Sequence, residues 1–488
     1  MPHHHMVLPH YMERSKEMDI EDKNKEQDSR ANCLPNSFES HTTSEDIPLL
    51  LPQEVGEMNP RLDEKTTFAD MTPSPRDLSE MHFGLLDESD AQTMGDPWAT
   101  DEEGNHASFE HDDGQVGPRL SCRCQIIRSV SQWSAGTSQT EDSIHTAYCS
   151  FIENAEHFIY IENQFFVSGL AGDQVIQNRV LDSIYKRILR AHREKKLFRV
   201  IVVVPLLPGF QGGLEDGGAA TVRALTHWQY RTISRGRPSI LYNLNRLLGP
   251  KTEDYISFYG LRNYGRLHED GPVVTSQVYV HSKVMIIDDR TTFIGSSNIN
   301  DRSLLGSRDS EIGVIIEDKE FLESSMNGEP WTAGKFAHSL RISLWAEHLG
   351  LNAGQARQIH DPIADATYKD LWLATAKANT MIYHEVFACI PNDEIHSRAA
   401  LRQVRSQWKE KHGHNTIDLG VAPRKLVDEE MAESEEVIIT ATDDDDPMEM
   451  LKAVRGFLVC FPLEFMRDED LRPMFNEGEF YASPQVFL

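Results

Sequence analysis

The sequence contains no long apolar run, and none approaches the roughly 18–20 residues that a membrane-spanning helix needs. The longest, Val200–Leu207, has the length of a buried strand and its exit. The first residues, Met1–Met6, also lack the basic region and apolar core of a secretory signal. We therefore expect a chain that neither crosses a membrane nor is secreted.

Cysteine is scarce, with six residues scattered along 488. Cys122 and Cys124 lie two positions apart, which fits no common zinc spacing, and no second pair completes a site. We therefore expect reduced thiols, as in a cytosolic protein, with no disulfide framework and no metal site.

Positive charge is also in deficit, because 48 lysines and arginines face 77 carboxylates and give a formal net charge of −29. Such a surface disfavours nonspecific binding to nucleic acid, so we expect no nucleic-acid partner. The acidity is uneven and is concentrated in the first 120 residues and in Glu429–Asp446. A local basic patch is compatible with this balance.

Composition divides the chain into four parts. Residues 1–118 are rich in polar and acidic residues without periodic apolar stretches, which predicts a disordered segment. A folded domain is expected over 119–425, followed by an acidic linker at 426–447 and a C-terminal segment at 448–488. Within that segment, Gly456–Pro462 predicts a short strand that could dock on the sheet of the folded domain.

Strand and helix patterns alternate within the folded domain. Apolar runs predict strands at Cys122–Val130, His157–Glu162, Val200–Val204 and Tyr255–Tyr259. Helical spacing predicts helices at Glu141–Asn154, Gln174–Lys195, Ala220–Ile233, Glu320–Leu349 (interrupted near Asn327–Gly334) and Asp365–Ala378. This alternation predicts an α/β fold in which helices flank a mixed β-sheet.

The most informative stretch begins at His281 and reads His-Ser-Lys-Val-Met-Ile-Ile-Asp. Its alternation predicts a strand, in which the side chains of His281 and Lys283 would point the same way. Asp288 closes this strand, and Thr291–Ile294 would be its hairpin partner. Glu311 begins a third apolar run.

These strands gather side chains that suit phosphoryl chemistry. Histidine can attack phosphorus or shuttle a proton near neutral pH, and lysine and asparagine can hold the oxygens as charge redistributes. A lone His-x-Lys would more often be a solvated strand edge, but the full run His-x-Lys-x4-Asp-x6-Gly-Ser-x-Asn is far more specific. The candidate catalytic residues are His281, Lys283, Asp288, Ser296, Asn298 and Glu311.

The run resembles the signature of the phospholipase D superfamily, in which two copies of the signature face each other across one active site. Only one copy is present here, because His281 is the only one of 21 histidines with a lysine two residues later. Further segments resemble the eukaryotic phosphatidylcholine-hydrolysing phospholipases D: Trp133–Gly136, Ile159–Phe166, Val204–Gly209, Asn300–Ser303, Gly456–Val459 and Phe461–Pro462.

The resemblance implies hydrolysis of phosphatidylcholine to phosphatidic acid and choline, and transfer of the phosphatidyl group to primary alcohols. One histidine would form a phosphohistidine while the other protonates the leaving alcohol and then activates water. His281 matches one of the two, and its role is left open between nucleophile and acid/base. Lys283 and Asn298 match phosphate-holding positions, Glu311 matches a carboxylate that orients an imidazole, and Asp288 would support the site. No metal or cofactor is implied.

One basic patch stands at the end of the predicted helix 174–195, formed by Lys186, Arg187, Arg190, Arg193, Lys195 and Lys196. Each cation could add about 1 kcal/mol of attraction to an anionic membrane surface. Alternatively, the patch is a solvated face whose cations lie favourably near the C-terminal dipole of the helix. The resemblance implies a phosphoinositide-binding site here, with the phosphoinositide as activating lipid.

The resemblance also implies partners and a location. The partners would be a phosphatidylcholine membrane surface and anionic phosphoinositides, with small GTPases and kinases as further candidates. The location would be cytoplasmic and peripheral on internal or plasma membranes.

Two groups of residues keep alternative interpretations. The polar residues after the strand at 157–162 could line a substrate pocket or simply end the strand: Glu162, Asn163 and Gln164. The aromatic residues Trp133, Phe165 and Phe166 are expected in the core, with a cation–π cage for choline as the alternative.

The first signature and the lipid-binding domains that precede it in the family are not found in this sequence. We expect the chain to be the C-terminal half of such an enzyme, starting inside the variable loop between the halves. A short inactive or regulatory isoform and a pairing of two copies are the alternatives. The competing function is a catalytically inactive module that binds lipid or protein. A half without its partner should expose apolar surface and aggregate.

Overall fold

The computed structural model describes residues 120–210, 214, 220–269, 271–412, 420–422 and 447–472. The segment predicted to be disordered, 1–118, lies outside the described residues, as does nearly all of the predicted acidic linker at 426–447. The fold below concerns the described residues alone.

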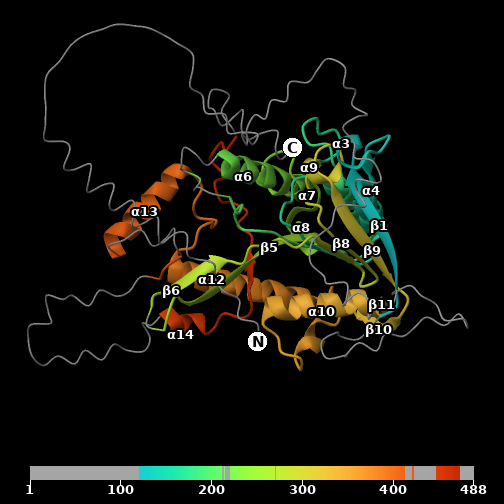
Figure 1. The fold of residues 1–488 in the computed structure, drawn as a ribbon. Coiled ribbons are helices and arrows are strands. Elements are labelled where there is room, and N and C mark those ends of the chain that lie inside the picture. Colours follow the sequence, from blue (N-terminus) through green and yellow to red (C-terminus); the bar gives the residue numbers. More distant parts are fainter. Residues whose placement is uncertain are drawn as a thin grey trace, which may run out of the picture. The chain divides into compact units, whose positions relative to one another are not determined.

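Ten strands form one sheet in the order β12-β5-β4-β3-β7-β8-β9-β1-β2, with β6 paired to β5 (Figure 1). Strand β3 pairs parallel to β4, and β4 parallel to β5, whereas the pairs of β3 with β7, β7 with β8 and β8 with β9 are antiparallel. The sheet is therefore mixed, and the predicted α/β class is confirmed. The strands are β1 (Cys122–Val130), β2 (Glu141–Asp142), β3 (Phe158–Glu162), β4 (Arg199–Val203), β5 (Ile256–Arg266), β6 (Val273–Gln277), β7 (Val284–Ile287), β8 (Thr291–Gly295), β9 (Glu311–Asp318) and β12 (Leu458–Cys460).

Helices surround this sheet. The α-helices are α3 (Gln132–Ala135), α4 (Ser143–Asn154), α5 (Val180–Glu194), α6 (Ala220–Ile233), α7 (Ile240–Leu248), α8 (Thr252–Tyr255), α9 (Asp301–Leu304), α10 (Lys335–Leu349), α11 (Asp365–Thr367), α12 (Ala374–Phe387), α13 (Arg398–His412) and α14 (Pro447–Leu451). Two 3-10 turns, Gly249–Lys251 and Ala356–Ile359, and a π-helical turn, Tyr368–Leu373, complete the described helical elements.

The central strands are buried on both faces, because helices cover each side. All five residues of β3 are buried, and the first four alternate between two hydrophobic clusters. Ile159 and Ile161 pack with residues of α4, α5 and α7, whereas Phe158 and Tyr160 pack with residues of α10 such as Trp345. Figure 1 shows α7 and α10 on opposite sides of the sheet. This arrangement explains the continuous apolar pattern of the strand.

One predicted helix is wrong over part of its length. Residues after Glu320 form a hairpin of β10 (Phe321–Met326) and β11 (Glu329–Gly334), and α10 begins only at Lys335. Asn327 and Gly328 occupy the turn with φ of 55° and 79°. An Asn-Gly pair with both φ angles positive is the favoured two-residue hairpin turn, so the patch treated as an interruption was the decisive signal.

Other boundaries shift for local reasons. The helix predicted from Gln174 starts at Val180, because the backbone N–H groups of Gln177 and Asn178 donate to the carboxylate of Asp301 instead, each at 2.7 Å. At the C-terminal side, β12 pairs antiparallel with β5, so the closing segment adds an edge strand to the sheet.

Candidate active site

Four chain segments meet at one end of four neighbouring strands. The register pairs Glu162, the last residue of β3, with Val284, the first residue of β7. Val284 in turn pairs with Ile294 of β8, and Gly295 pairs with Gly313 of β9. The residues just before β7, just after β3 and β8, and at the start of β9 therefore converge. The predicted hairpin of β7 and β8 is confirmed.

Lys283 is a buried cation at this meeting point. Its Nζ donates to Oε1 of Gln164 at 3.1 Å and to the main-chain oxygen of His281 at 2.7 Å. Burial lowers the pKa of Lys283, and the charge of Glu311 acts in the opposite direction. The ammonium is thus held between the exit of β3 and the main chain of its own segment.

His281 lies beside this cation but is exposed. The predicted strand begins later than expected, at Val284, so His281 and Lys283 precede the ladder and do not share one environment. The pKa of His281 lies below its usual value, because partial burial and then the charge of Lys283 disfavour the imidazolium. The neutral form, which is the one able to attack phosphorus or accept a proton, is favoured.

Ser296 and Glu311 form a second part of the site. The Oγ of Ser296 donates to Oε2 of Glu311 at 2.5 Å and accepts from the backbone N–H of Ile312 at 3.1 Å. The resemblance implies that Glu311 orients an imidazole. In this structure Glu311 accepts a hydrogen bond from Ser296. Asn298 is half-buried, and its Oδ1 has no hydrogen-bond partner among the described residues.

Asp288 lies at the opposite end of β7. It is five residues from Lys283, or about 16 Å at roughly 3.3 Å per residue. Its carboxylate accepts three backbone N–H groups, from Glu156, His157 and Phe158, at 2.6 to 2.8 Å. Burial raises its pKa to about 6, against the effect of these hydrogen bonds. The geometry favours support of the link between α4 and β3 over a reacting role.

The two pocket candidates differ from each other. Asn163 is fully buried, and its Oδ1 accepts from the backbone N–H groups of Phe165 and Ile299, both at 3.1 Å. It therefore ties the exit of β3 to the segment after β8 and is not free to line a pocket. Gln164 is half-buried and reaches the site through Lys283.

The aromatic predictions also divide. Phe165 and Phe166 are buried, as expected for core residues. Trp133 is 69% exposed, so its prediction as a core residue is wrong. Its helix α3 has four residues, none of them buried, and a single turn of that length cannot bury a large ring on its own.

The basic patch loses one member in the structure. Arg187 is buried: its guanidinium donates to the main-chain oxygens of Ala155 and Glu156 at 2.5 and 2.8 Å and stacks 3.8 Å above the ring of Phe198. Burial lowers its pKa to about 10. It therefore joins α5 to the end of α4 and cannot face a membrane.

The other cations of the patch stay at the surface to different degrees. Lys186 pairs with Asp182 at 2.7 Å, and Arg190 donates to the main-chain oxygen of Glu153 at 2.5 Å. Arg193, Lys195 and Lys196 are exposed at the end of α5 and just beyond it. The exposed cations are therefore Lys186 on α5 and a group at its end, Arg193 in the last turn with Lys195 and Lys196 just beyond it.

Two site residues were missed from the sequence, His348 and Ser282. Both contact Glu162, for which the sequence left open a pocket lining or a polar strand end. A buried carboxylate calls for a partner, but His348 lies 186 residues away, so no local pattern could identify it.

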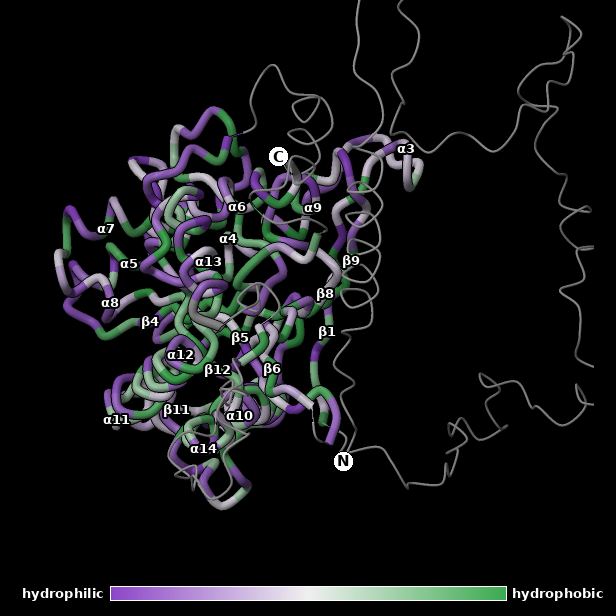
Figure 2. Tube along the Cα trace, turned by 90° about the vertical axis from the view of Figure 1, so that its left-hand side faces the viewer, coloured by the Kyte–Doolittle hydropathy of each residue, from purple (hydrophilic) through white to green (hydrophobic). Residues whose placement is uncertain are grey.

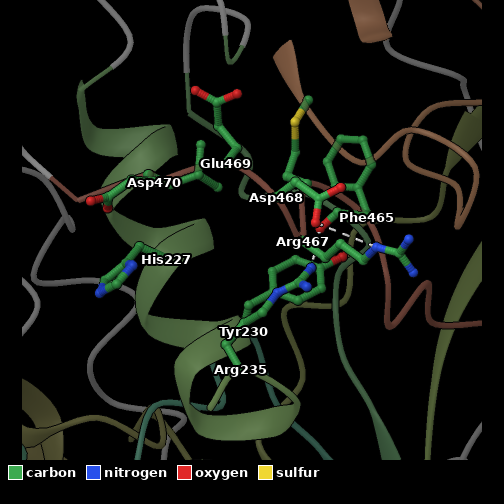
Figure 3. Close-up of a pocket in the computed structure, with 10 residues that line it drawn as sticks. His227, Tyr230, Arg235, Phe465, Arg467, Asp468, Glu469 and Asp470 are labelled. Atoms are coloured by element: carbon green, nitrogen blue, oxygen red, sulfur yellow. Dashed lines mark hydrogen bonds and ion pairs between the residues drawn. The ribbon is translucent and has the colours of Figure 1, made fainter. Parts of the chain in front are cut away.

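A pocket of about 350 Å³ lies elsewhere, between α6 and the residues that follow β12 (Figure 3). His227, Tyr230 and Arg235 line it from α6 and its C-terminal end, together with Phe465–Leu471. Its charged groups are largely paired, since Arg467 contacts Glu464 and Asp468 and Arg472 contacts Asp470. None of the candidate catalytic residues lines it.

Within the described ranges, histidine, cysteine and carboxylate side chains nowhere form a group of three or more that could hold a metal ion. None of the described helices combines the length and apolar character needed to cross a bilayer.

An α/β sheet that presents an imidazole, a buried oriented ammonium, an amide and a carboxylate at neighbouring strand ends defines a site suited to cleaving phosphodiesters. Comparison with known proteins agrees with this class. The family model described as Phospholipase D matches residues 119–276 and 273–392. The chain therefore belongs to the phospholipase D family, and the resemblance to eukaryotic members is confirmed.

Similar proteins come from plants and animals. The chain is 58% identical over 509 residues to phospholipase D zeta 1 of Arabidopsis thaliana, covering 100% of this chain and 46% of that protein. It is 61% identical over 493 residues to phospholipase D zeta 2 of the same plant, covering 100% and 44%. Phospholipase D1 of Mus musculus is 42% identical over 373 residues, covering 76% and 32%. The chain thus spans less than half the length of these relatives.

Proposed function

We propose that the chain supplies one half of the active site of a phospholipase D that hydrolyses phosphatidylcholine to phosphatidic acid and choline. The observation that carries the proposal is the pairing of His281 with Lys283: an exposed imidazole with a lowered pKa beside a buried ammonium held by Gln164. Cleavage of a phosphodiester needs a nucleophile or proton carrier and a cation that holds the phosphate. The two side chains that could fill these roles are adjacent here.

The reaction would proceed in two displacements. A histidine nitrogen attacks phosphorus, the bond from phosphorus to the choline oxygen breaks, and a second imidazole gives its proton to that oxygen. The second imidazole then takes a proton from water, which displaces the histidine and leaves phosphatidic acid. His281 would fill one role, with the other histidine provided from outside this sequence, while Lys283 and Asn298 hold the non-bridging oxygens.

The same two steps predict transfer to alcohols, because a primary alcohol can replace water in the second displacement. Glu311 accepts a hydrogen bond from Ser296. In the complete two-half site it would also orient an imidazole. The chemistry needs no metal in this scheme, since the imidazoles and lysines carry the charge.

We also propose that the protein acts in the cytoplasm, peripherally on a membrane. The exposed cations Arg193, Lys195 and Lys196 support binding to an anionic lipid surface, with a phosphoinositide as the activating lipid.

The test is a choline-release assay on phosphatidylcholine vesicles that contain a phosphoinositide. The chain is assayed alone and mixed with a separately expressed first half taken from phospholipase D zeta 2. We expect release only from the mixture, and formation of phosphatidylbutanol when butanol is added. Release by the chain alone would contradict the two-half site, and vesicle binding without release from either sample would favour an inactive lipid-binding module.

A further inference from the structure

The segment that carries His281 has no strand ladder of its own. Strand β6 ends at Gln277 and β7 starts at Val284, so His281 and Ser282 lie between two ladders. Ordered backbone outside a ladder depends on a few individual hydrogen bonds for its position. The backbone N–H of Gly295 donates to the main-chain oxygen of Lys283 at 3.1 Å. Beyond that bond, the side-chain bonds of Ser282 and Lys283 help to set where the imidazole stands.

Ser282 is held from the end of β3. Its Oγ donates to Oε2 of Glu162 at 2.5 Å. The next residue, Lys283, is held from the same strand exit through Gln164. The neighbours Ser282 and Lys283 are thus hydrogen-bonded to Glu162 and Gln164, respectively.

Glu162 is itself fixed from two sides. Its side chain is buried. The hydroxyl of Tyr160 donates to its Oε1 at 2.7 Å, and Nε2 of His348 lies 2.9 Å from the same oxygen. Burial raises the pKa of Glu162, but bonds from His348, Ser282 and Tyr160 and the interaction with His348 outweigh this and lower it overall. A carboxylate buried in this way retains its position because moving it would leave a charge without partners.

His348 is equally constrained. It sits in the last turn of α10, is buried, and its main-chain oxygen accepts from the backbone N–H of Phe457, just before β12, at 2.9 Å. Because an ionised carboxylate only accepts, Nε2 of His348 donates to Glu162. Its Nδ1 is buried without a partner in the part of the chain that the structure describes. Besides its edge-on packing against Trp372, the ring is therefore oriented by its hydrogen bond to Glu162.

We propose that Glu162 and His348 are positioning residues for the reacting site, which through Ser282 fix the backbone that carries His281 and Lys283. The inference rests on the proposed function for its consequence in catalysis, although its structural part can be tested without activity. Neither residue contacts the phosphate in this scheme. Their role is to keep the imidazole within reach of phosphorus, where a displacement of about 1 Å can cost about 100-fold in rate.

A matched control is available on the same helix. His338 of α10 also pairs with a buried carboxylate, with Nδ1 at 2.9 Å from Oδ2 of Asp289. Asp289 follows β7 at the end far from His281. His338→Gln and His348→Gln therefore remove similar buried contacts. Only His348→Gln should change the position of His281.

The experiment uses the full chain labelled with ¹³C at the Cε1 position of histidine. The resonance of His281 is assigned by its loss in His281→Gln. We expect this resonance to shift or broaden in Glu162→Gln, Ser282→Ala and His348→Gln, and to stay in place in His338→Gln. Ser282→Thr, which keeps the hydroxyl, should restore the wild-type position.

The same variants are then assayed for choline release in the mixture with the first half. We expect kcat to fall roughly 10- to 100-fold with little change in KM for the three site-linked variants, and no such fall for His338→Gln. Should Glu162→Gln fail to fold, Ser282→Ala decides, because it removes a single hydroxyl.

The outcomes separate the two proposals. A His281 resonance that is unchanged in both Ser282→Ala and His348→Gln would overturn the positioning role, whatever the activity. The His281 resonance could instead move as expected while the mixture releases no choline, with wild type or with any variant. That result would support the positioning role and count against the proposed function.

Discussion

The ammonium of Lys283 lies 3.1 Å from the amide oxygen of Gln164, so the cation of the site is oriented in part from the exit of the neighbouring strand β3. The same lysine donates to the main-chain oxygen of His281. This contact places a fixed positive charge next to the imidazole and makes the two residues one electrostatic unit.

The first prediction concerns this unit. The imidazole of His281 should titrate below 6.5 in the folded chain, because partial burial and the charge of Lys283 both disfavour the imidazolium. Lys283→Met should raise the pKa of His281 without restoring it fully, since burial remains. An NMR titration of the His281 Cε1–H resonance measures both, with Lys196→Met as the control. An unchanged midpoint in Lys283→Met would contradict the coupling.

The second prediction concerns Asp288. Asp288→Ala should lower the free energy of unfolding by about 3 kcal/mol, because it leaves buried backbone N–H groups without an acceptor. Asp288→Asn should cost less, since its amide oxygen can still accept. Urea unfolding followed by circular dichroism checks this, with the exposed Asp370→Ala as a control expected within about 0.5 kcal/mol of wild type. Wild-type stability of Asp288→Ala would leave the carboxylate available for another role.

The third prediction separates structure from lipid binding in the basic patch. Arg187→Ala should destabilise the fold by about 2 kcal/mol, because it removes two hydrogen bonds to the end of α4 and the stacking on Phe198. Arg193→Gln and Lys196→Gln should leave the stability nearly unchanged. Each should weaken binding to phosphoinositide vesicles about fivefold, for about 1 kcal/mol per cation.

Vesicle sedimentation and urea unfolding measure these two effects on the same variants. Vesicles that carry phosphatidylserine at equal surface charge show whether the headgroup or the charge alone is recognised. A stable Arg187→Ala variant with impaired lipid binding would contradict this separation. It would support the sequence prediction that Arg187 belongs to the lipid-binding patch.

The fourth prediction concerns an apolar strip on β1 and β9. Ile126 and Ile312 are 64% and 60% exposed, and Ile126 pairs with Val314, two residues from Ile312, so all three share one face. Figure 2 shows these strands along one edge of the described fold, with apolar stretches in green. Such a strip should make the isolated chain self-associate.

Light scattering after size exclusion at several concentrations tests this strip. The double variant Ile126→Thr/Ile312→Thr should self-associate less than wild type. Met381→Thr, on the surface of α12, removes a side chain that is 71% exposed and should change nothing. A monomeric wild-type chain at every concentration would show that the strip does not drive association.

The sequence predicted those parts of the fold that depend on local periodicity. The apolar runs Val284–Ile287 and Thr291–Ile294, next to the alternation that leads into Lys283, were enough to predict the central hairpin. The same reasoning failed after Glu320, where the turn preference of Asn327-Gly328 overrode the helical spacing. Local turn chemistry, when strong, outweighs a weak periodic pattern.

The sequence allowed a set of candidate site residues to be chosen, but not their arrangement. Nothing in the sequence distinguishes Arg187 from the cations beside it, because its partners are main-chain oxygens on another helix. Likewise, the pairing of Glu162 with His348 exists only once α10 packs under β3. Such tertiary contacts decide which members of a motif react, which bind and which hold the others.

The central claim is that His281 is a reacting group of a lipid phosphodiesterase, and one substitution tests it most directly. His281→Gln is assayed in the mixture with the first half, beside His268→Gln, which alters an exposed histidine outside the site. We predict that choline release falls at least roughly 10³-fold in His281→Gln while vesicle binding persists, and that His268→Gln keeps wild-type activity. Wild-type release by His281→Gln would contradict the account.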